Sequence, residues 1–192
     1  MQNEITIRPA RAEDASVIAE LVTMAMTDEC CMHFCGERHT PDDFRTLIAA
    51  LAARRGTQYS YENTICATTG DGRIAGISVS YDGSLLFELR QAFIDGAKAA
   101  FNIDHSGMSA ETQAGELYLD SLAVYPEYRG RGIAKKLIDA TADKAKRMGT
   151  GPVGLLVDEN NPKAERLYLS QGFAVVNLNE WGGHKMKHMQ KF

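Results

Sequence analysis

An alternating apolar run, a basic glycine turn and a long amphipathic pattern follow one another in the middle of the chain. The run ELYLDSLAV (116–124) has the strongest strand pattern, and GIAKKLIDATADKAKRMG (132–149) has helical spacing and a closing glycine. The continuous apolar run VGLLVDE (153–159) comes next and is typical of a strand covered on both faces. A strand, a helix and a second buried strand in this order indicate an α/β domain.

The remaining segments supply the other elements of this domain. Residues 4–10 predict a short strand, and the patterns at 14–26, 40–56 and 162–172 predict helices. The β-rich runs at 63–69 and 73–81 predict a hairpin around Gly-Asp-Gly, and 173–181 and 184–192 predict two closing strands. Residues 85–115 are expected to be an insert that is helical in its first half. We therefore expect a single domain over residues 1–192 with a mixed sheet.

The composition excludes several functional classes. A net charge of -4 gives no sign of a nucleic-acid partner or of a basic membrane-binding arm. No apolar run is long enough to span a bilayer, and the first ten residues lack the apolar segment of a signal peptide. We therefore expect a cytoplasmic protein without nucleic-acid or membrane partners. The closing strands could offer an edge for a homodimer.

The segment DECCMHFC (28–35) holds three of the four cysteines and one histidine. Zinc sites usually combine a CxxC-type pair with a second, distant pair, which is missing here because Cys66 stands alone. Cys31 and Cys35 are spaced by one helical turn. The segment therefore predicts helix cysteines, reduced in the cytoplasm, and no metal site.

The turn after residue 124 has the chemistry of a phosphate site. The first N–H groups of a helix lack intrahelical acceptors and lie at the positive end of its dipole. Gly130 and Gly132 have no Cβ, so an anion can approach the backbone, and Arg129 and Arg131 add charged donors. Neither a Walker loop nor a dinucleotide-binding fingerprint fits these residues. On these residues alone, one alternative stays open: the turn is a flexible connection between a strand and a helix, its glycines allow the bend, and its arginines are solvated.

Two longer motifs point to a known family. The segment LAVYPEYRGRGIAKKLI (122–138) resembles the acetyl-CoA-binding motif of the GNAT superfamily of N-acyltransferases, R/Q-x-x-G-x-G/A. NPKAERLYLSQGF (161–173) is similar to the second motif of that family, with five positions in register: Asn161, Ala164, Tyr168, Gly172 and Phe173. The resemblance covers roughly residues 116–173, and the 85–115 insert is longer than the usual connection of the family.

The resemblance implies a GNAT-like fold: a mixed, mostly antiparallel central sheet with a parallel, splayed strand pair and helices on both faces. It also implies acetyl-CoA as co-substrate, without a metal. The turn would bind the pyrophosphate, the splayed strand would bind pantetheine, and a backbone N–H near Leu122 would stabilise the charge that develops on the acetyl carbonyl. The implied cofactor-binding residues are Leu122, Ala123, Val124, Arg129, Gly130, Arg131, Gly132, Ile133, Ala134, Asn161, Ala164 and Tyr168. For Asn161, a plain helix N-cap is the alternative.

Acetyl transfer to an amine requires removal of a proton from the ammonium form. Strand alternation predicts that one face carries Glu116, Tyr118, Asp120, Leu122 and Val124. Asp120 is the first candidate for the general base and Glu116 the second, with simple pairing to a basic neighbour as the alternative. The resemblance implies that Tyr168 is the general acid for the departing thiolate, and its alternative is a packing role.

The sequence therefore predicts an N-acetyltransferase that moves an acetyl group directly from acetyl-CoA to a primary amine on a small molecule. Two alternatives stay open: a protein lysine or N-terminal acetyltransferase, and a non-catalytic acyl-CoA-binding sensor. The sensor would keep the phosphate turn but would not need Asp120 and Tyr168. A protein acceptor would need an open peptide groove, whereas an insert that covers the acceptor site would favour a small molecule.

Overall fold

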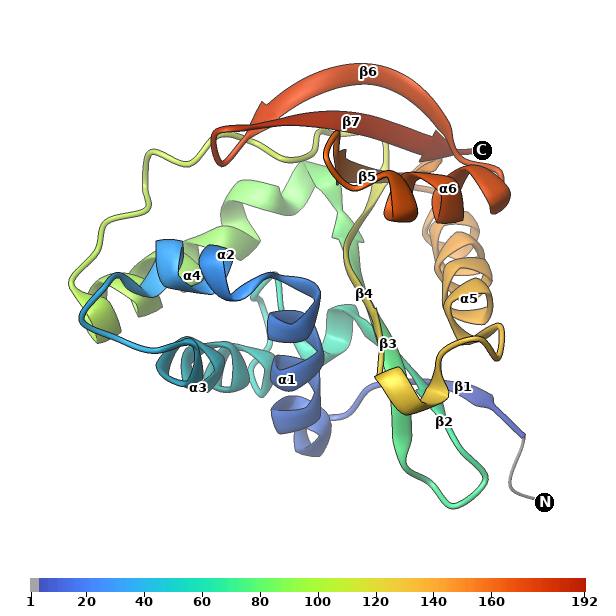
Figure 1. The fold of residues 1–192 in the computed structure, drawn as a ribbon, viewed down its shortest axis with the longest axis horizontal. Helices are drawn as coiled ribbons and strands as arrows, with labels where there is room; N and C mark the ends of the chain where they lie inside the picture. The colour runs from blue at the N-terminus through green and yellow to red at the C-terminus, as the bar shows by residue number, and fades with distance from the viewer. Residues whose placement is uncertain (1–3) are drawn as a thin grey trace.

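The computed structural model describes residues 4–192 and has a seven-stranded sheet at its centre (Figure 1). The strands are β1 (Thr6–Pro9), β2 (Thr64–Thr68), β3 (Ile74–Asp82), β4 (Leu117–Val124), β5 (Val153–Asp158), β6 (Ala174–Trp181) and β7 (His184–Lys191). Their order in the sheet is β1-β2-β3-β4-β5-β7-β6. The β4–β5 pair is parallel and the other neighbouring pairs are antiparallel, which confirms the predicted mixed sheet.

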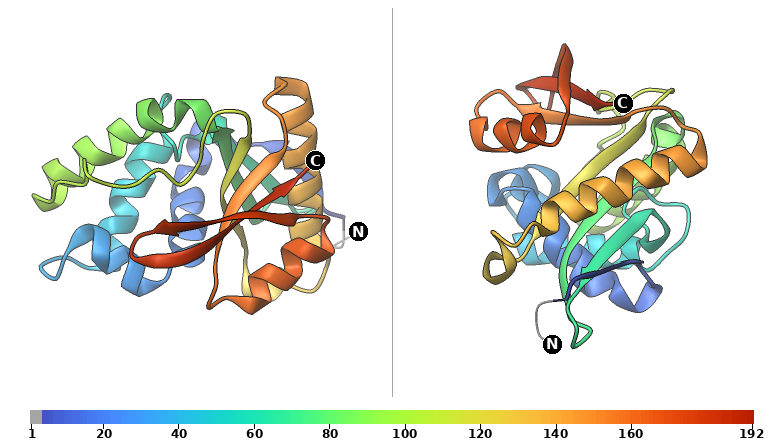
Figure 2. Two further views of the ribbon diagram at one scale, coloured as in Figure 1. Left: turned by 90° about the horizontal axis from the view of Figure 1, so that it is seen from above. Right: turned by 90° about the vertical axis from the view of Figure 1, so that its right-hand side faces the viewer.

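Helices cover both faces of this sheet. They are α1 (Ala15–Ala25), α2 (Asp28–Cys35), α3 (Pro41–Ala52), α4 (Leu86–Phe101), α5 (Ile133–Met148) and α6 (Pro162–Ser170). Helices α1 to α4 lie on one side of the sheet, and α5 and α6 lie on the other (Figures 1 and 2). Within residues 4–192, none of the helices combines the length and the apolar character needed to cross a bilayer.

The order of elements differs from expectation in one place, because three helices rather than two precede the β2–β3 hairpin. The additional helix, α2, consists of the cysteine segment, whose helical conformation is thereby confirmed. Thr27 caps its start by accepting a hydrogen bond from the Cys30 N–H (3.2 Å), and Gly36, at a φ of 77°, ends it. This cap separates α2 from α1.

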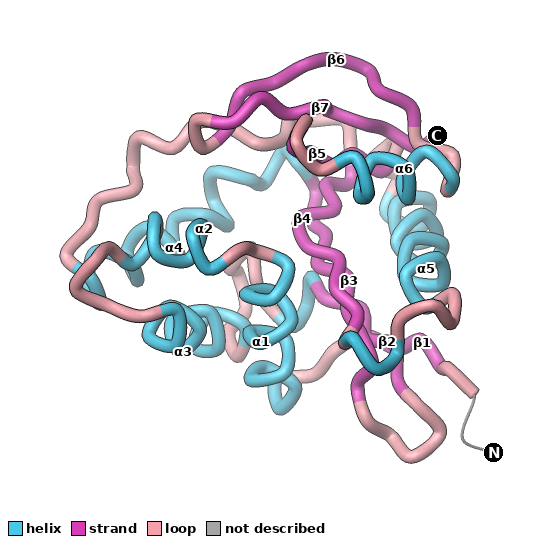
Figure 3. Tube along the Cα trace, in the orientation of Figure 1, coloured by secondary structure: helices cyan, strands magenta, loops and turns pink. Residues whose placement is uncertain are grey.

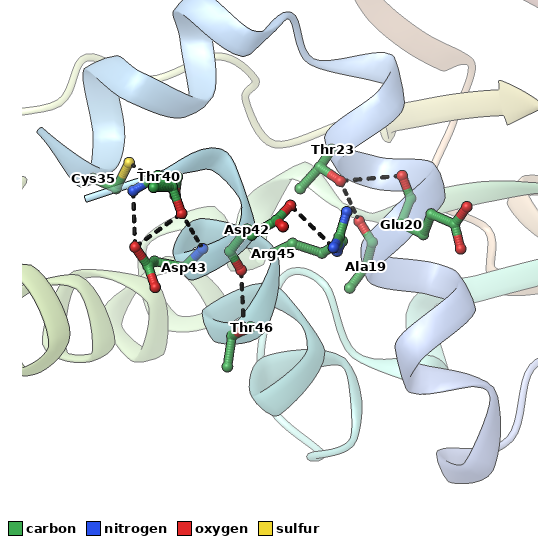
Figure 4. Close-up of polar contacts among 9 residues, drawn as sticks. All are labelled: Ala19, Glu20, Thr23, Cys35, Thr40, Asp42, Asp43, Arg45 and Thr46. Atoms are coloured by element: carbon green, nitrogen blue, oxygen red, sulfur yellow. Dashed lines mark hydrogen bonds and ion pairs between the residues drawn. The ribbon is translucent and has the colours of Figure 1, made fainter. Parts of the chain in front are cut away.

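The start of α3 shows how local sequence fixes these helices (Figure 4). Thr40 accepts a hydrogen bond from the Asp43 N–H at 3.2 Å, and Asp43 accepts one from the Thr40 N–H at 2.8 Å. This reciprocal pair satisfies two backbone donors, and losing such a cap typically costs about 1 kcal/mol. The Cys35 thiol donates to the Thr40 carbonyl at 3.5 Å, so the end of α2 is tied to the start of α3.

Two apolar cores form on the two sides of the sheet. On one side, Phe34, Phe44 and Phe93 bring α2, α3 and α4 together above β2, β3 and β4. On the other side, α5 packs over β2, β3 and β4, while α6 lies over β5. The central strands are therefore buried on both faces, as the continuous apolar pattern of residues 153–159 predicts.

β4 and β5 separate soon after they begin. Their pairing is limited to Leu117 with Val153 and Tyr118 with Gly154, whereas β3 stays paired along most of β4. This geometry is the splayed parallel pair that the sequence motifs imply. Beyond Tyr118, the edge of β4 that faces β5 is open to a ligand's hydrogen-bonding groups.

β4 also carries a bulge at the point where it leaves β5. Val79 lies opposite Ser121 and Ser80 lies opposite Leu119, so Asp120 is the extra residue. The bulge reverses the alternation of side chains beyond it: Leu122 and Val124 contact the α5 core. The expectation that these two share the face of Tyr118 and Asp120 is wrong, because a strict two-residue period holds only in a regular strand.

Candidate active site

The basic glycine turn forms an open cradle at the start of α5. Gly130 and Gly132 have φ angles of 75° and 74°, in the left-handed region that favours glycine. A Cβ placed on either residue would meet no protein atom within 4 Å, so both glycines border open space. The unpaired N–H groups of the first helical turn, including those of Ile133 and Ala134, lie beside this space. The cradle has the features of an anion-binding site at a helix N-terminus.

The two arginines of the turn are held by their own loop. The Arg129 Nε donates to the Val124 carbonyl at 3.0 Å, and an Arg131 Nη donates to the Glu127 carbonyl at 2.9 Å. The Arg131 guanidinium also lies 5.5 Å from the ring centre of Tyr128. These contacts keep two positive charges at the start of α5, where they add to its dipole.

Asn161 adopts the capping role that was considered as its alternative. Its side-chain oxygen accepts a hydrogen bond from the Ala164 N–H at 3.1 Å, which fixes the start of α6. The residue also lines the large pocket described below. Capping uses the amide oxygen and leaves the amide NH₂ group to donate, so a cofactor contact is compatible with this geometry.

Tyr168 lies on the α5–α6 side of the splayed strands. Its ring packs edge-on against Phe173 with a centroid distance of 5.4 Å, in the apolar cluster that includes Leu119 and Leu122. Burial raises the pKa of the phenol to about 12. The group therefore stays protonated at neutral pH and is available as a hydrogen-bond donor to a departing thiolate.

Asp120 lies at the bulge and faces the side of α1 to α4. Its Oδ2 lies 3.1 Å from the Tyr81 hydroxyl, and its Oδ1 accepts from the Ser121 hydroxyl at 2.8 Å. Desolvation raises the pKa of the carboxyl, against the opposing effect of these hydrogen bonds. Asp120 and Tyr168 thus approach the splayed strands from opposite faces of the sheet.

A second carboxyl group, Glu111, lies beside Asp120 and was not expected from the sequence. It forms a buried ion pair with Arg90 of α4, and its Oε2 accepts from the Trp181 indole N–H at 3.1 Å. Its Oε1 lies 3.2 Å from the Tyr81 hydroxyl. Burial, and next the charge of Asp120, raise the pKa of Glu111 to about 7.

One sequence signal pointed toward this cluster. Arg90 occupies the apolar face of α4 together with Leu86, Leu89 and Phe93, and a cation on such a stripe requires a buried acidic partner. The sequence does not identify that partner, because Glu111 belongs to the irregular loop between α4 and β4, where no periodicity relates positions to faces.

Glu116 is fully buried and lies in a separate cluster. Its carboxylate contacts the His188 Nε2 and the Gln190 Nε2, each at 2.8 Å, and accepts from the Thr112 hydroxyl at 2.5 Å. Burial favours its neutral form, but these hydrogen bonds outweigh that effect and lower its pKa. It also covers Gly154, where a Cβ would overlap the carboxylate. These contacts join β4, β5 and β7, which leaves Asp120 as the better candidate base.

A pocket of about 870 Å³ lies next to the Arg90–Glu111 ion pair. Its lining comes from the end of α1 through α2, from the loop after α4, from the β5–α6 connection and from the β6–β7 hairpin. Two lining residues, Trp181 and Met108, connect the pocket to this ion pair. The Trp181 indole N–H donates a hydrogen bond to Glu111, and the Met108 carbonyl accepts one from Arg90 at 3.1 Å. The loop of the 85–115 insert runs along this pocket toward the β6–β7 hairpin (Figure 3).

The pocket walls are acidic and aromatic. Glu29, Asp104 and Asp158 line it together with three histidines, and the Nδ1 of one of these, His184, lies 2.8 Å from the Asp158 carboxylate; the described lining includes no lysine or arginine. Phe34 and Trp181 add aromatic surface. Such a lining favours a cationic ligand, because carboxylates attract it over distance and aromatic faces bind it at contact.

The cysteines of α2 are small apolar core residues. Cys31 and Cys35 are buried, and desolvation raises the pKa of Cys31 to about 11. Within residues 4–192, no group of three or more histidine, cysteine or acidic side chains is arranged to hold a metal ion.

We expect elemental analysis of the purified protein to find no stoichiometric zinc, because high thiol pKa values disfavour the thiolate ligands that zinc requires. A dialysed sample treated with a chelator provides the control for loosely bound metal. One zinc ion per chain that survives this treatment would overturn the assignment of the cysteines to the core.

Comparison with known proteins identifies the family of the chain. The sequence model described as "Acetyltransferase (GNAT) family" matches residues 60–173, which include β2 to β5, the glycine turn and α6. The chain belongs to the GNAT acetyltransferase family. A solved acetyltransferase structure shares 31% identity with this GNAT chain, covers 97% of it and 98% of its own length, and has a TM-score of 0.78.

Two further relatives place this GNAT chain among acetyltransferases. The N-acetyltransferase from Staphylococcus aureus Mu50 is 25% identical, with a TM-score of 0.79 over 96% of this chain and 99% of its own. The "GCN5-related N-acetyltransferase 4, chloroplastic" of Arabidopsis thaliana is 27% identical over 92% of this chain. The aligned region spans 63% of the plant protein's length.

Proposed function

We propose that this protein transfers the acetyl group of acetyl-CoA directly to the primary amine of a small, cationic molecule. The observation that carries the proposal is the arrangement around the β4 bulge. Asp120 lies at the bulge of the splayed strand, the open glycine cradle follows the end of that strand, and Trp181 and Met108 link Glu111 and Arg90 to the neighbouring pocket. Family membership supports acetyl transfer, and the pocket supports the class of acceptor.

Each part of CoA has a matching feature in this arrangement. The pyrophosphate would bind the N–H groups of the turn at Gly130 to Ala134, with Arg129 and Arg131 as nearby charges. The pantetheine amides would pair with the open edge of β4 at Leu122 to Val124, as a further strand pairs with a sheet edge. Asn161 and Ala164 would flank this arm from the start of α6. The thioester would then lie beside the bulge, where a β4 backbone N–H stabilises the developing oxyanion.

The chemical step would use groups on both faces of the splayed β4–β5 pair. Asp120 takes one proton from the ammonium group, directly or through a water molecule, and the neutral nitrogen attacks the thioester carbon. A C–N bond forms and the C–S bond breaks, while Tyr168 gives its phenolic proton to the departing thiolate. The amide nitrogen releases its second proton, which restores the Tyr168 phenol. The products are the acetylated amine, free CoA and one proton held by Asp120.

The insert supports a small acceptor over a protein one. Its loop supplies Asp104, His105, Gly107, Met108 and Ser109 to one side of the pocket, and this added side favours a compact acceptor over an extended peptide. A lysine side chain or a protein N-terminus is the alternative acceptor. The sensor alternative is disfavoured because a domain that only binds acyl-CoA does not require the buried Asp120–Glu111 cluster beside the acceptor pocket.

A screen of acceptors for CoA release tests this function. Purified protein and acetyl-CoA are combined with small mono-, di- and polyamines, with aminated sugars and with peptides that carry free lysines or N-termini. We expect at least one small cationic amine to give a kcat/KM well above that of every peptide. A peptide that exceeds all small amines would establish the protein-acceptor alternative, and CoA binding without release would establish the sensor.

The Asp120→Asn variant tests the base. We expect kcat/KM to fall by about a hundredfold or more at neutral pH, since positioned bases contribute at least that much. Raising the pH should restore part of the loss, because a larger fraction of the amine is then neutral without the enzyme's help. A rate equal to that of the wild type at neutral pH, or a loss of the same size at every pH, would remove Asp120 from this role.

A further inference from the structure

Asp120 and Glu111 both face the hydroxyl group of Tyr81. This hydroxyl cannot donate a hydrogen bond to both carboxyl groups when both are ionised. The Tyr81 oxygen lies 3.1 Å from the Asp120 Oδ2 and 3.2 Å from the Glu111 Oε1. A phenol has one proton, so it can donate to only one of the two carboxyl oxygens. The second contact becomes a hydrogen bond only when that carboxyl carries a proton and donates it to the Tyr81 oxygen. The geometry therefore matches a pair of carboxyl groups with one proton between them.

The other contacts of the two carboxyl groups, and their exposure, show that the two groups have different roles. Arg90 and Trp181 both bind the Oε2 of Glu111, and the side chain of Arg90 is only 2% exposed, so this side of the cluster is fixed inside the protein. Glu111 is 5% exposed, whereas Asp120 keeps partial exposure. Asp120 is thus the more exposed member of the pair, and Glu111 is the member that the protein holds in place.

The charge balance of the cluster supports a shared proton. Asp120 is faced by Tyr81 of β3, by Tyr118 and Ser121 of β4, by Gln58 and Tyr59 of the segment before β2, by Arg90 of α4 and by Glu111. Among these groups Arg90 carries the positive charge, against two carboxyl groups. Two buried carboxylates beside one cation retain uncompensated negative charge, which favours the uptake of one proton.

We propose that Asp120, Tyr81 and Glu111 form a unit built to hold one shared proton, and that Glu111 is a positioning residue that makes Asp120 a stronger base. The role of this unit in catalysis rests on the proposed function. When both carboxyl groups are ionised, Asp120 accepts the proton from the ammonium group of the acceptor molecule. The Asp120 carboxyl then donates to the Tyr81 oxygen, while the Tyr81 hydroxyl donates to Glu111. The proton is held without leaving an unpaired buried charge.

Titration of the carboxyl groups by ¹³C NMR tests the unit without any acceptor. In the wild type, we expect the Asp120 and Glu111 signals to share a transition near neutral pH. Glu111→Gln removes one negative charge and should lower the Asp120 midpoint by about one pH unit or more, a tenfold loss of proton affinity. Tyr81→Phe removes the hydrogen bond to the ionised form and should raise the midpoint instead. These opposite shifts are not expected of residues that only support packing.

Glu116→Gln is the matched control, because it neutralises another buried glutamate, which lies just before β4 and contacts His188 and Gln190 rather than Tyr81. It should leave the Asp120 midpoint unchanged. An Asp120 signal that titrates alone below pH 5 in the wild type, or an unmoved midpoint in Glu111→Gln, would overturn the proposal. If Glu111→Gln does not fold, the Tyr81→Phe shift and the shared wild-type transition decide the question.

Activity provides a second, separate readout once an acceptor is known. Glu111→Gln should move the ascending limb of the kcat/KM–pH profile to lower pH and reduce its plateau, while KM for acetyl-CoA stays unchanged. A reduced rate with an unmoved limb would show that Glu111 only supports the pocket wall. Failure to find any acceptor would reject the proposed function but leave the NMR result interpretable.

Discussion

The Gly132→Val variant should lose acetyl-CoA binding by about a hundredfold or more, equivalent to about 2.8 kcal/mol. Gly132 precedes the first turn of α5, and its missing side chain borders the open cradle. A valine there would occupy the space that the pyrophosphate needs. It would also have to adopt a φ near 74°, which costs a branched residue about 1–2 kcal/mol. Titration calorimetry with acetyl-CoA measures the loss.

Gly149→Val separates backbone strain from blocked binding. Gly149 ends the same helix at a φ of 69°, and a Cβ there also meets no protein atom within 4 Å. The control should therefore lower the melting temperature to a similar degree and leave acetyl-CoA affinity unchanged. A folded Gly132→Val protein with wild-type affinity would reject the assignment of the turn to the pyrophosphate.

The Tyr168→Phe variant should reduce kcat by about a hundredfold or more when chemistry is rate-limiting. The substitution removes one hydroxyl and keeps the ring, so the packing against Phe173 should persist. Without the phenolic proton the thiolate would depart as a free anion in an apolar setting, which raises the barrier to C–S cleavage. Acetyl-CoA affinity should change little, because the proton is needed only as the bond breaks.

Tyr61→Phe is a suitable control for this experiment. Its hydroxyl accepts from the Arg55 Nε at 3.1 Å, in the segment just before β2 and outside the pocket lining. This variant should have wild-type turnover and affinity. Tyr168→Phe with wild-type turnover, in an assay where pre-steady-state kinetics show that chemistry limits the rate, would leave Tyr168 with the packing role alone.

The local sequence pattern was sufficient to predict much of the fold. The β4–turn–α5 segment, the largely buried β5 and the α6 helix with its proline start are encoded by residues close in sequence, and the structure confirms each of them. The helical character of DECCMHFC also follows from local spacing, although its separation from α1 depended on the Thr27 cap. The splay of β4 and β5 was inferred from the family motifs rather than from spacing.

The features that sequence did not predict depend on distant partners. The bulge at Asp120 arises from the register between β3 and β4, so alternation along β4 alone gave the wrong face for Leu122 and Val124. Glu116 was a candidate base until contacts with Thr112, His188 and Gln190 placed it in a different cluster. Glu111 acquires its role from Arg90 and Trp181, which lie 21 and 70 positions away.

The most direct test of the account follows the acetyl carbon itself. Purified protein is incubated with [¹³C₂]acetyl-CoA and a pool of small amines and amine-bearing peptides, and both the small molecules and the intact protein are analysed by mass spectrometry. Direct transfer into the acidic pocket predicts the label in a small acetylated amine, formed together with an equal amount of CoA, and no labelled protein. Label that remains in acetyl-CoA, or that appears only on peptides or on the protein itself, would contradict the account.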